Sequence, residues 1–442
     1  MKKLIPMLML SLSAVTMSAQ EQTDYLYINL ADGQVVKYAV SEISSMSFTD
    51  KMTPDNETPE FPAPDGSMEF DMLNPAASVG MLLEKAGTEC TDTLGRIVIT
   101  EEQYNEIKVF TDNLVSGLTT QYTIYRKCFT WITSNVKYAQ GYVDNNPYPV
   151  FKTKTAVCQG YANLLHVMMH TQGIPAMVVN GWLDSVVYDG MLTGLGHAWN
   201  YVYCDGNWFV SDATNNLQYQ MSNLSQYKSK LAPTSMDVVV FKEDDCWVNF
   251  NECRLNISKV ITEKDFFVTP YSVEGFKVTC FNPFESLPSN VRELYIGENI
   301  ESLGDNTVGL DIYAPNVEFV SVAPGNKNYL SHAGAVYYSK SYVPVEYWVS
   351  VNRNVPAYIP AALKSLELYA NDVPAGGIVY GKNAIYKVNG VEEIRFPEET
   401  AKLESFAVEQ CPNLKVAYVP KDAEVSSNAF YNVHNDFKIE RY

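Results

Sequence analysis

The sequence predicts an α+β protein in which a helix carrying a cysteine packs on an antiparallel sheet, followed by a C-terminal β-rich solenoid. Apolar residues recur at helical spacing from residue 101 to residue 138, and again after Cys158. Two alternating apolar runs flank Asp205-Gly206, which is typical of a β-hairpin. Beyond about residue 285, short apolar phrases end in Pro or Gly. A chain of 442 residues is expected to form two or three domains.

The N-terminal residues have the layout of a cleaved secretory signal. Lys2 and Lys3 precede the apolar run from Leu4 to Val15, and the small residues Ser18 and Ala19 follow it. This run is too short to span a bilayer stably, and no later stretch reaches the length of a membrane helix. We therefore expect an exported protein (periplasmic, at the cell surface or secreted) with no transmembrane segment after signal cleavage.

Residues 20–67 are predicted to form a small module and a linker. Two alternating runs within residues 25–49 flank Asp32-Gly33, a dipeptide suited to a tight turn, so residues 20–49 are expected to form a β-hairpin module. Residues 50–67 are rich in Pro and acidic residues and lack apolar periodicity. This composition predicts an extended linker.

The charge and the cysteine content argue against several kinds of site. A formal net charge of −19 argues against a partner held through phosphates, so we expect no nucleic-acid binding. The eight cysteines are scattered without CxxC spacing, which indicates neither a zinc knuckle nor a dense disulfide framework. If Cys158 is a free thiol, seven cysteines remain, and at least one more must be free. No metal or organic cofactor is implied.

Cys158 lies where a nucleophilic thiol is favoured. It falls in the first turn of a predicted helix whose apolar stripe comprises Tyr161, Leu164, Leu165 and Met168. The unpaired backbone N–H groups and the helix dipole at this turn favour a thiolate. A lone cysteine at a helix start is more often an inert buried thiol, so its role depends on the partners that the fold brings to it.

His197 and Asp212 are the predicted partners of this thiol. If Asp205-Gly206 forms a two-residue turn, Trp199 opposes Asp212, and His197 and Asp212 share one face of the hairpin. As diagonal neighbours they would lie roughly 7 Å apart at the backbone, within reach of their side chains. A three-residue loop would put them on opposite faces, so the predicted triad depends on this register.

Chemistry assigns a role to each of the three side chains. His197 would take the thiol proton, and Asp212 would orient the ring and stabilise its charged form. The Cys158 thiolate would attack an acyl carbonyl to form a thioester, which water hydrolyses or an amine captures. The backbone N–H of Cys158 is the natural first oxyanion donor. The sequence does not identify the second donor; the upstream aromatic residues are Trp131, Tyr138 and Tyr148.

His166 and His170 stand one helical turn apart, like the two ligands of a zinc-protease helix. The intervening residues are Val-Met-Met, so the catalytic glutamate of that motif is missing. Both histidines also point away from the apolar stripe of the predicted helix. We therefore expect two solvent-facing histidines and no metal site.

The three candidate residues lie in two segments, KTAVCQGYANLLHVMMHTQGIPAMVVNG and GHAWNYVYCDGNWFVSDAT. Both segments resemble the transglutaminase-like family, whose pattern is G-V-C-x-G-Y-A, then G-I-P, then H-A-W-N and G-x-W-x-x-x-D-x-T. The resemblance covers roughly residues 100–220 and implies a papain-type core with Cys158, His197 and Asp212 as the catalytic triad. Ala156 stands where Gly is common, and Asn215 where an aromatic residue often follows. The family includes crosslinking enzymes, peptidases, amidases and inactive members, so the reaction stays open.

The C-terminal apolar phrases recur at a regular spacing. Within EEIRFPEETAKLESFAVEQCPNLKVAYVP, the phrases IRFP and AYVP align at a period of 23 residues. Such a period is typical of a solenoid in which each repeat buries its apolar face against its neighbour. These phrases resemble the BspA-like leucine-rich repeats of bacterial surface proteins. The resemblance implies binding or adhesion, with a protein as the expected ligand, but identifies no particular partner.

These observations divide the chain into five parts and lead to one leading function. The expected parts are a signal peptide (1–19), a hairpin module (20–49), a linker (50–67), a transglutaminase-like catalytic domain (68–255) and a BspA-like leucine-rich-repeat region (256–442). We expect an exported cysteine acyl-transfer enzyme, with hydrolysis of protein or cell-wall peptide preferred. The alternatives are a surface binding or adhesion protein whose transglutaminase-like domain is inactive, and a protein-crosslinking transglutaminase.

Overall fold

The computed structural model describes most of the chain and separates it into two compact units. The described residues are 25–29, 35–39, 59–89, 94, 97–188, 191–221, 231–237, 240–283, 286–303, 314–340 and 352–442. The two units comprise residues 1–58 and 59–442. In the first unit, β1 (Tyr25–Asn29) pairs antiparallel with β2 (Val35–Ala39). The predicted signal peptide and residues 50–58 of the predicted linker lie outside the described residues, and residues 59–67 contain no helix or strand.

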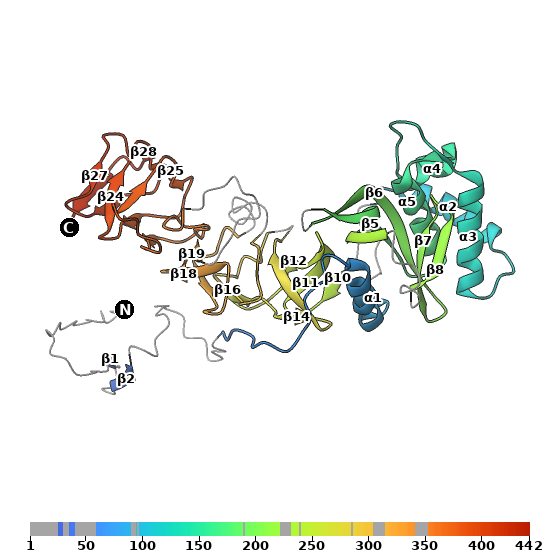
Figure 1. Ribbon diagram of the computed structural model, residues 1–442, viewed down its shortest axis with the longest axis horizontal. Helices are drawn as coiled ribbons and strands as arrows, with labels where there is room; N and C mark the ends of the chain where they lie inside the picture. The colour runs from blue at the N-terminus through green and yellow to red at the C-terminus, as the bar shows by residue number, and fades with distance from the viewer. Residues whose placement is uncertain are drawn as a thin grey trace, which may run out of the picture. The chain divides into compact units, whose positions relative to one another are not determined.

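Cys158 belongs to a region formed by four helices and a five-stranded antiparallel sheet. Figure 1 shows these helices beside the strands of the sheet. The helices are α2 (Glu101–Leu114), α3 (Gln121–Asn135), α4 (Pro147–Thr153) and α5 (Cys158–Thr171). The strands, in sheet order, are β8 (Leu217–Gln220), β7 (Asn207–Asp212), β6 (Met191–Cys204), β5 (Ala176–Tyr188) and β9 (Leu231–Asp237). α5 packs on β5 and β6, and the other three helices pack on α5. The predicted α+β core, with the cysteine helix on an antiparallel sheet, is confirmed.

Local sequence signals determine where the helices before Cys158 begin. Thr100 caps α2 by accepting the backbone N–H of Gln103, and the Gln103 side chain accepts the N–H of Thr100 in return. Thr120 caps α3 through the N–H of Thr123. The inward faces of these helices then meet α5 and β6 in one apolar core. Its fully buried members include Ile107, Phe129, Ile132, Leu165 and Val202.

The β6–β7 hairpin has the predicted register. Cys204 pairs with Asn207, so Asp205 and Gly206 form a two-residue turn. Both turn residues have positive φ, 47° and 86°, as a type I′ turn requires. Because side chains alternate along a strand, this register puts the two predicted partners of the thiol on one face of the hairpin.

α5 is buried on nearly all sides, which corrects the prediction for two histidines. His166 is only 1% exposed. His170 is partly buried, and its Nδ1 is hydrogen-bonded to the hydroxyl of Tyr104 in α2 at 2.8 Å. The prediction of solvent-facing side chains was wrong because it assumed a helix with one covered face, whereas α5 lies between a sheet and three other helices.

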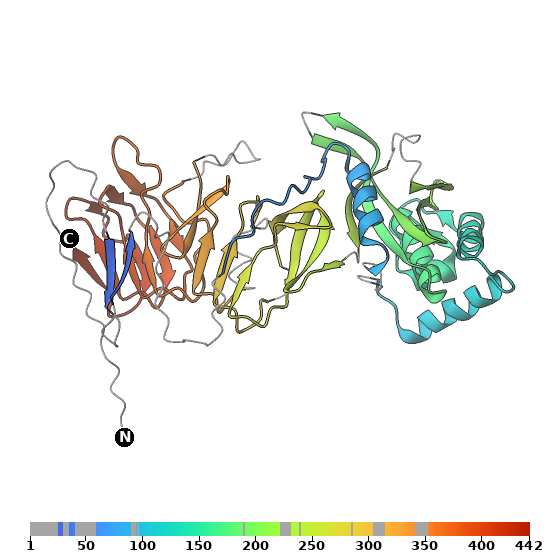
Figure 2. The ribbon, with the colours of Figure 1, turned by 90° about the horizontal axis from the view of Figure 1, so that it is seen from below.

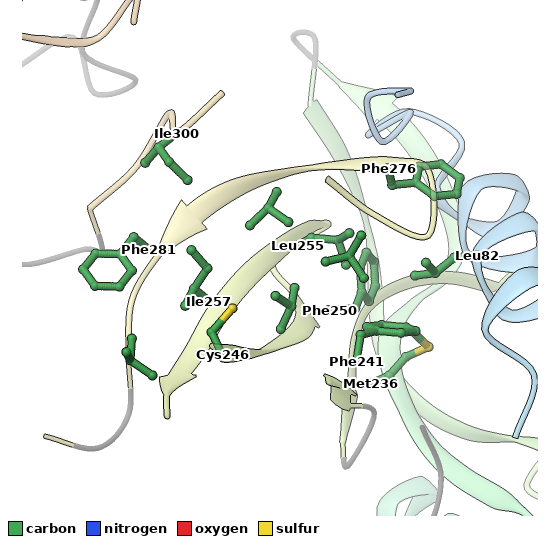
Figure 3. Close-up of a cluster of buried hydrophobic side chains, with 14 of the residues drawn as sticks. Leu82, Met236, Phe241, Cys246, Phe250, Leu255, Ile257, Phe276, Phe281 and Ile300 are labelled. Atoms are coloured by element: carbon green, nitrogen blue, oxygen red, sulfur yellow. The ribbon is translucent and has the colours of Figure 1, made fainter. Parts of the chain in front are cut away.

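A second five-stranded sheet follows the first, and the sequence analysis did not predict it. Its order is β10 (Val240–Lys242), β11 (Cys246–Asn251), β12 (Arg254–Val260), β15 (Phe276–Phe281) and β14 (Ser272–Val273). Helix α1 (Pro75–Ala86) contributes Leu82 to the same core as Phe250, Leu255 and Phe276 (Figure 3). The predicted domain division after residue 255 falls within β12 and stays a prediction.

The C-terminal part is a parallel β-solenoid (Figure 2). Its first strands are β13 (Phe266–Val268), β16 (Glu293–Ile296) and β17 (Phe319–Val322), followed by the hairpin β18 (Tyr329–His332) and β19 (Ala335–Tyr338). Three further stacks of strands follow. The first comprises β20 (Ser365–Glu367), β23 (Glu393–Arg395), β26 (Val416–Val419) and β29 (Lys438–Arg441). The second comprises β21 (Ile378–Tyr380), β24 (Thr400–Leu403) and β27 (Glu424–Val425), and the third comprises β22 (Ile385–Tyr386), β25 (Val408–Cys411) and β28 (Phe430–Val433). Ile394 pairs with Ala417, which confirms the 23-residue alignment of IRFP with AYVP. The predicted solenoid is confirmed.

Two findings apply to the described residues as a whole. None of their helices is both long enough and apolar enough to cross a membrane. Of the seven cysteines that the structure describes, all but Cys158 are buried. Cys128, Cys204, Cys246, Cys253 and Cys411 are free thiols, which confirms that Cys158 is not the only one.

Candidate active site

Cys158 is the first residue of α5, and the preceding loop holds it there. Val157 precedes it in an extended conformation, with φ −95° and ψ −179°. The N–H of Val157 donates to the side-chain oxygen of Asn145 at 3.2 Å, and the side-chain amide of Asn163 in α5 donates to the Asn145 carbonyl at 2.9 Å. The short strands β3 (Lys137–Tyr138) and β4 (Thr155–Ala156) pair just before the helix. The start of α5 is therefore anchored by both backbone and side-chain hydrogen bonds.

The first turn of α5 leaves no room for a side chain at Gly160. A Cβ at this position would lie 2.7 Å from the Cβ of Ala156 and 2.9 Å from Cγ2 of Val150. Both distances are shorter than real carbon–carbon contacts, so a larger residue would push the helix start away from β4 and α4. Glycine at this position thus contributes to the placement of the neighbouring thiol.

His197 and Asp212 are hydrogen-bonded to each other. Nε2 of His197 lies 2.8 Å from Oδ2 of Asp212, and both side chains are buried. Oδ2 also accepts the side-chain amide of Asn215 at 2.7 Å, while Oδ1 accepts the backbone N–H groups of Thr214 and Asn215 at 3.1 and 3.2 Å. Because a carboxylate only accepts, Nε2 carries the proton, and Nδ1 is left for the thiol.

The Cys158 thiol and the His197 ring stabilise each other's charged forms. Burial raises the pKa of the thiol, but hydrogen bonds from His197 and from the backbone of Ala198 and Gln159 outweigh burial, so the pKa lies below its usual value of 9.0. Burial lowers the pKa of His197, but its hydrogen bonds to Asp212 and Cys158 raise it to about 9. This arrangement favours a thiolate–imidazolium pair, the reactive form of a cysteine nucleophile.

Asn200 ties the cysteine helix to the histidine strand, and the sequence analysis missed it. Its side chain is fully buried, and its amide donates to the carbonyl of Ala162 in α5 at 3.0 Å and to that of Met177 in β5 at 3.2 Å. Replacing this side chain would remove one hydrogen bond from each of two backbone carbonyls in the interior. A polar residue three positions after His197, in a strand that otherwise faces the core, was the signal that could have identified it.

The three aromatic residues considered for the oxyanion site lie in different places in the structure. Trp131 is partly buried and packs against the core of the helical layer, and the hydroxyl of Tyr148 donates to Glu106 at 2.7 Å. Tyr138 in β3 pairs with Ala156, two residues before the cysteine, and its ring is half exposed. Of the three, Tyr138 is therefore the one that lies in the strand pair leading directly into α5.

Comparisons with known proteins identify the region around this site. Residues 108–213 match the model of the Transglutaminase-like superfamily. Kyphoscoliosis peptidase of Homo sapiens is 29% identical over 116 residues, which cover 23% of this chain and 18% of the relative. The Mus musculus protein of the same name is 30% identical over 98 residues, which cover 20% of this chain and 15% of the relative. The match spans less than a fifth of either relative's length.

Solved structures resemble parts of the chain. The periplasmic domain of TgpA from Pseudomonas aeruginosa is 14% identical, covers 33% of this chain and 50% of that chain, and has a TM-score of 0.23. A leucine-rich cell surface protein from Faecalibacterium prausnitzii is 8% identical, covers 46% of this chain and 94% of that chain, and has a TM-score of 0.18. The superfamily match and the cysteine helix packed on its antiparallel sheet lead to one conclusion: residues 108–213 form a domain of the transglutaminase-like superfamily.

Proposed function

We propose that this chain is an exported cysteine acyl-transfer enzyme with Cys158 as nucleophile, His197 as base and Asp212 as the residue that orients the ring. The observation that carries the proposal is the hydrogen-bonded series from the thiol through the imidazole to the buried carboxylate, located at the start of α5. A thiol activated by an imidazole that a third group orients is the arrangement that nucleophilic catalysis requires. Export is proposed from the secretory signal pattern at the N-terminus.

In the proposed reaction the Cys158 thiolate attacks the carbonyl carbon of an amide. The backbone N–H of Cys158 donates to the oxyanion that forms. The His197 imidazolium then gives its proton to the leaving nitrogen as the C–N bond breaks, which leaves a thioester and a neutral ring. Water attacks the thioester while His197 accepts its proton, and collapse of the second intermediate releases the acid and restores the thiolate–imidazolium pair.

We propose hydrolysis of protein or cell-wall peptide rather than crosslinking. Water is abundant outside the cell, and the relatives named above are called peptidases, which supports a peptide substrate. In this proposal the solenoid binds a protein ligand and the transglutaminase-like domain carries the chemistry.

The rate at which iodoacetamide alkylates Cys158 tests the proposed nucleophile. At pH 7 we expect alkylation of the parent protein to be at least roughly tenfold faster than that of His197→Ala, because the ring stabilises the thiolate. Cys128 is an internal control, since burial raises its pKa to about 12. Labelling of Cys158 at the rate of an unactivated thiol, or equally in both proteins, would contradict the enzyme and favour a binding protein.

The acyl acceptor is tested separately, with amide peptides and cell-wall fragments as substrates and Cys158→Ala as the blank. Each substrate is incubated with and without an added primary amine, and the products are identified by mass spectrometry. A new free carboxylate as the main product in both conditions supports hydrolysis. Incorporation of the amine as the main product would contradict hydrolysis and identify a crosslinking transglutaminase.

A further inference from the structure

The strand that carries His197 has an unpaired edge beside the thiol. β6 pairs with β5 from Val202 to Met191. On its other side, β6 pairs with β7 only from Asn200 to Cys204. No other strand of the described residues pairs with residues 191–199 on that side. The backbone groups of this stretch, which runs outward past His197, are therefore open to a further strand.

The register shows which residues face this edge. The N–H of Tyr203 donates to the carbonyl of Pro175 on the β5 side, so the odd-numbered residues of β6 direct their backbone groups toward β5. Even-numbered residues face the other way. Ala198 agrees with this assignment, because its backbone hydrogen-bonds the sulfur of Cys158. The next group on the edge belongs to Gly196, roughly 7 Å farther along the strand. Beyond Gly196 the pairing of β6 with β5 is irregular, between Leu183 and Val186.

Neither packing nor backbone conformation requires a glycine at position 196. A Cβ at this position would meet no atom within 4 Å, and its φ is not positive. At Gly194, by contrast, a Cβ would lie 2.7 Å from the carbonyl oxygen of Leu183. A strand glycine that the fold does not require is typical of a place where another backbone approaches closely.

The β5–β6 arm beyond this point also exposes apolar side chains. In Figures 1 and 2 the ends of the two strands extend past the helical layer. The exposed fractions are 59% for Val186, 54% for Val187, 75% for Tyr188, 62% for Met191 and 68% for Leu195. By the register, Val186, Tyr188 and Met191 lie on one face of this arm, so they offer an apolar surface that a partner can cover.

We propose that the acyl donor is an extended segment of a polypeptide, which adds to the edge of β6 as a further strand and so presents its carbonyl to Cys158. This inference rests on the proposed function and specifies its substrate. The occupant follows from the chemistry of the edge: alternating N–H and C=O groups at strand spacing match the backbone of an extended chain. The apolar arm adds a preference for apolar side chains in that segment.

The test measures alkylation of Cys158 in the full-length protein by peptide probes. The probes are tetrapeptides of alternating valine and threonine that carry a chloroacetyl group at the N-terminus or a chloromethyl ketone at the C-terminus, each with and without methylated backbone nitrogens. Two orientations are needed because an added strand can run in either direction. For at least one orientation, we expect N-methylation to lower the alkylation rate roughly tenfold, the effect of one or two backbone hydrogen bonds.

Gly196→Pro and Gly196→Ala form a matched pair of variants. Proline removes the N–H from the edge, whereas alanine keeps it, and an edge strand tolerates proline when its N–H faces solvent. For each variant the peptide-probe rate is divided by the iodoacetamide rate, so that changes in thiol reactivity cancel. We expect this ratio to be roughly tenfold lower in the proline variant than in the alanine variant.

The outcomes separate this inference from the proposed function. One outcome is that iodoacetamide labels Cys158 rapidly and in a way that depends on His197, while N-methylation and Gly196→Pro leave the peptide-probe ratios unchanged. This outcome would overturn strand addition but would still support the proposed enzyme. Slow labelling by iodoacetamide that does not depend on His197 would overturn both.

Discussion

Replacement of Asp212 by Asn tests how far the buried carboxylate controls the reactivity of the thiol. The pKa of His197 is about 9, although burial alone would place it below the ordinary value of 6.5. A shift of this size corresponds to about 3 kcal/mol in favour of the imidazolium. Hydrogen bonding to Asp212 makes the largest contribution that raises the pKa, ahead of Cys158. Most of this stabilisation should therefore be lost when the carboxylate charge is removed.

The asparagine variant keeps the size of the side chain and can still accept a hydrogen bond from the ring. We expect the rate of Cys158 alkylation by iodoacetamide at pH 6 to fall roughly 10- to 100-fold, and the pH–rate profile to move upward by about one to two pH units. Above about pH 10 the two proteins should react alike, because both thiols are then ionised. Mass spectrometry of the alkylated peptide between pH 5 and pH 10 measures this, with urea unfolding of both proteins as the control. Identical profiles would refute the view that Asp212 stabilises the charged ring.

Three other substitutions test how the residues in and around the site stabilise it. Gly160→Ala should lower the free energy of unfolding in urea by about 1–3 kcal/mol because the new Cβ overpacks the helix start; Gly196→Ala, where the space is open, is the matched control, and equal stabilities would contradict this account. Asn200→Ala should cost about 1–3 kcal/mol of unfolding free energy and slow Cys158 alkylation, since the two buried hydrogen bonds that join α5 and β5 to β6 are lost. Unchanged alkylation would mean that Asn200 does not position the thiol. In Cys158→Ala the unfolding free energy should fall as pH rises above about 6.5, because the Asp212 hydrogen bond still raises the pKa of folded His197, which keeps its proton after the unfolded ring has lost it. The parent should show a flatter curve, because the lowered pKa of its thiol gives the opposite slope; curves of the same slope would argue against the charged pair.

The features predicted correctly from sequence are those encoded by neighbouring residues. The Asp205-Gly206 turn and the alternating runs beside it determine the hairpin register, and that register places His197 and Asp212 on one face. Repeated phrases 23 residues apart predict the parallel stack of the solenoid. Each of these signals spans no more than one hairpin or one repeat.

The features that sequence analysis missed depend on packing between distant segments. His166 was expected in solvent because the amphipathic pattern of α5 reports one covered face, but not how many elements surround the helix. The second sheet was missed because its short strands have no distinctive turn or motif. Asn145 gave no signal at all, since its side chain acts on a backbone group twelve residues later.

The sequence by itself determined which residues begin the helix, which ones form the turn, and which face of the hairpin each side chain occupies, because propensity, capping and alternation act over a few residues. Only the tertiary structure decided that the sulfur of Cys158 lies at the edge of β6, beside the backbone of Ala198, with the rest of that edge unpaired. The physical reason is that the contact between the start of α5 and the middle of β6 is made by side-chain packing and by the Asn200 bridge between helix and sheet, across about forty residues of chain.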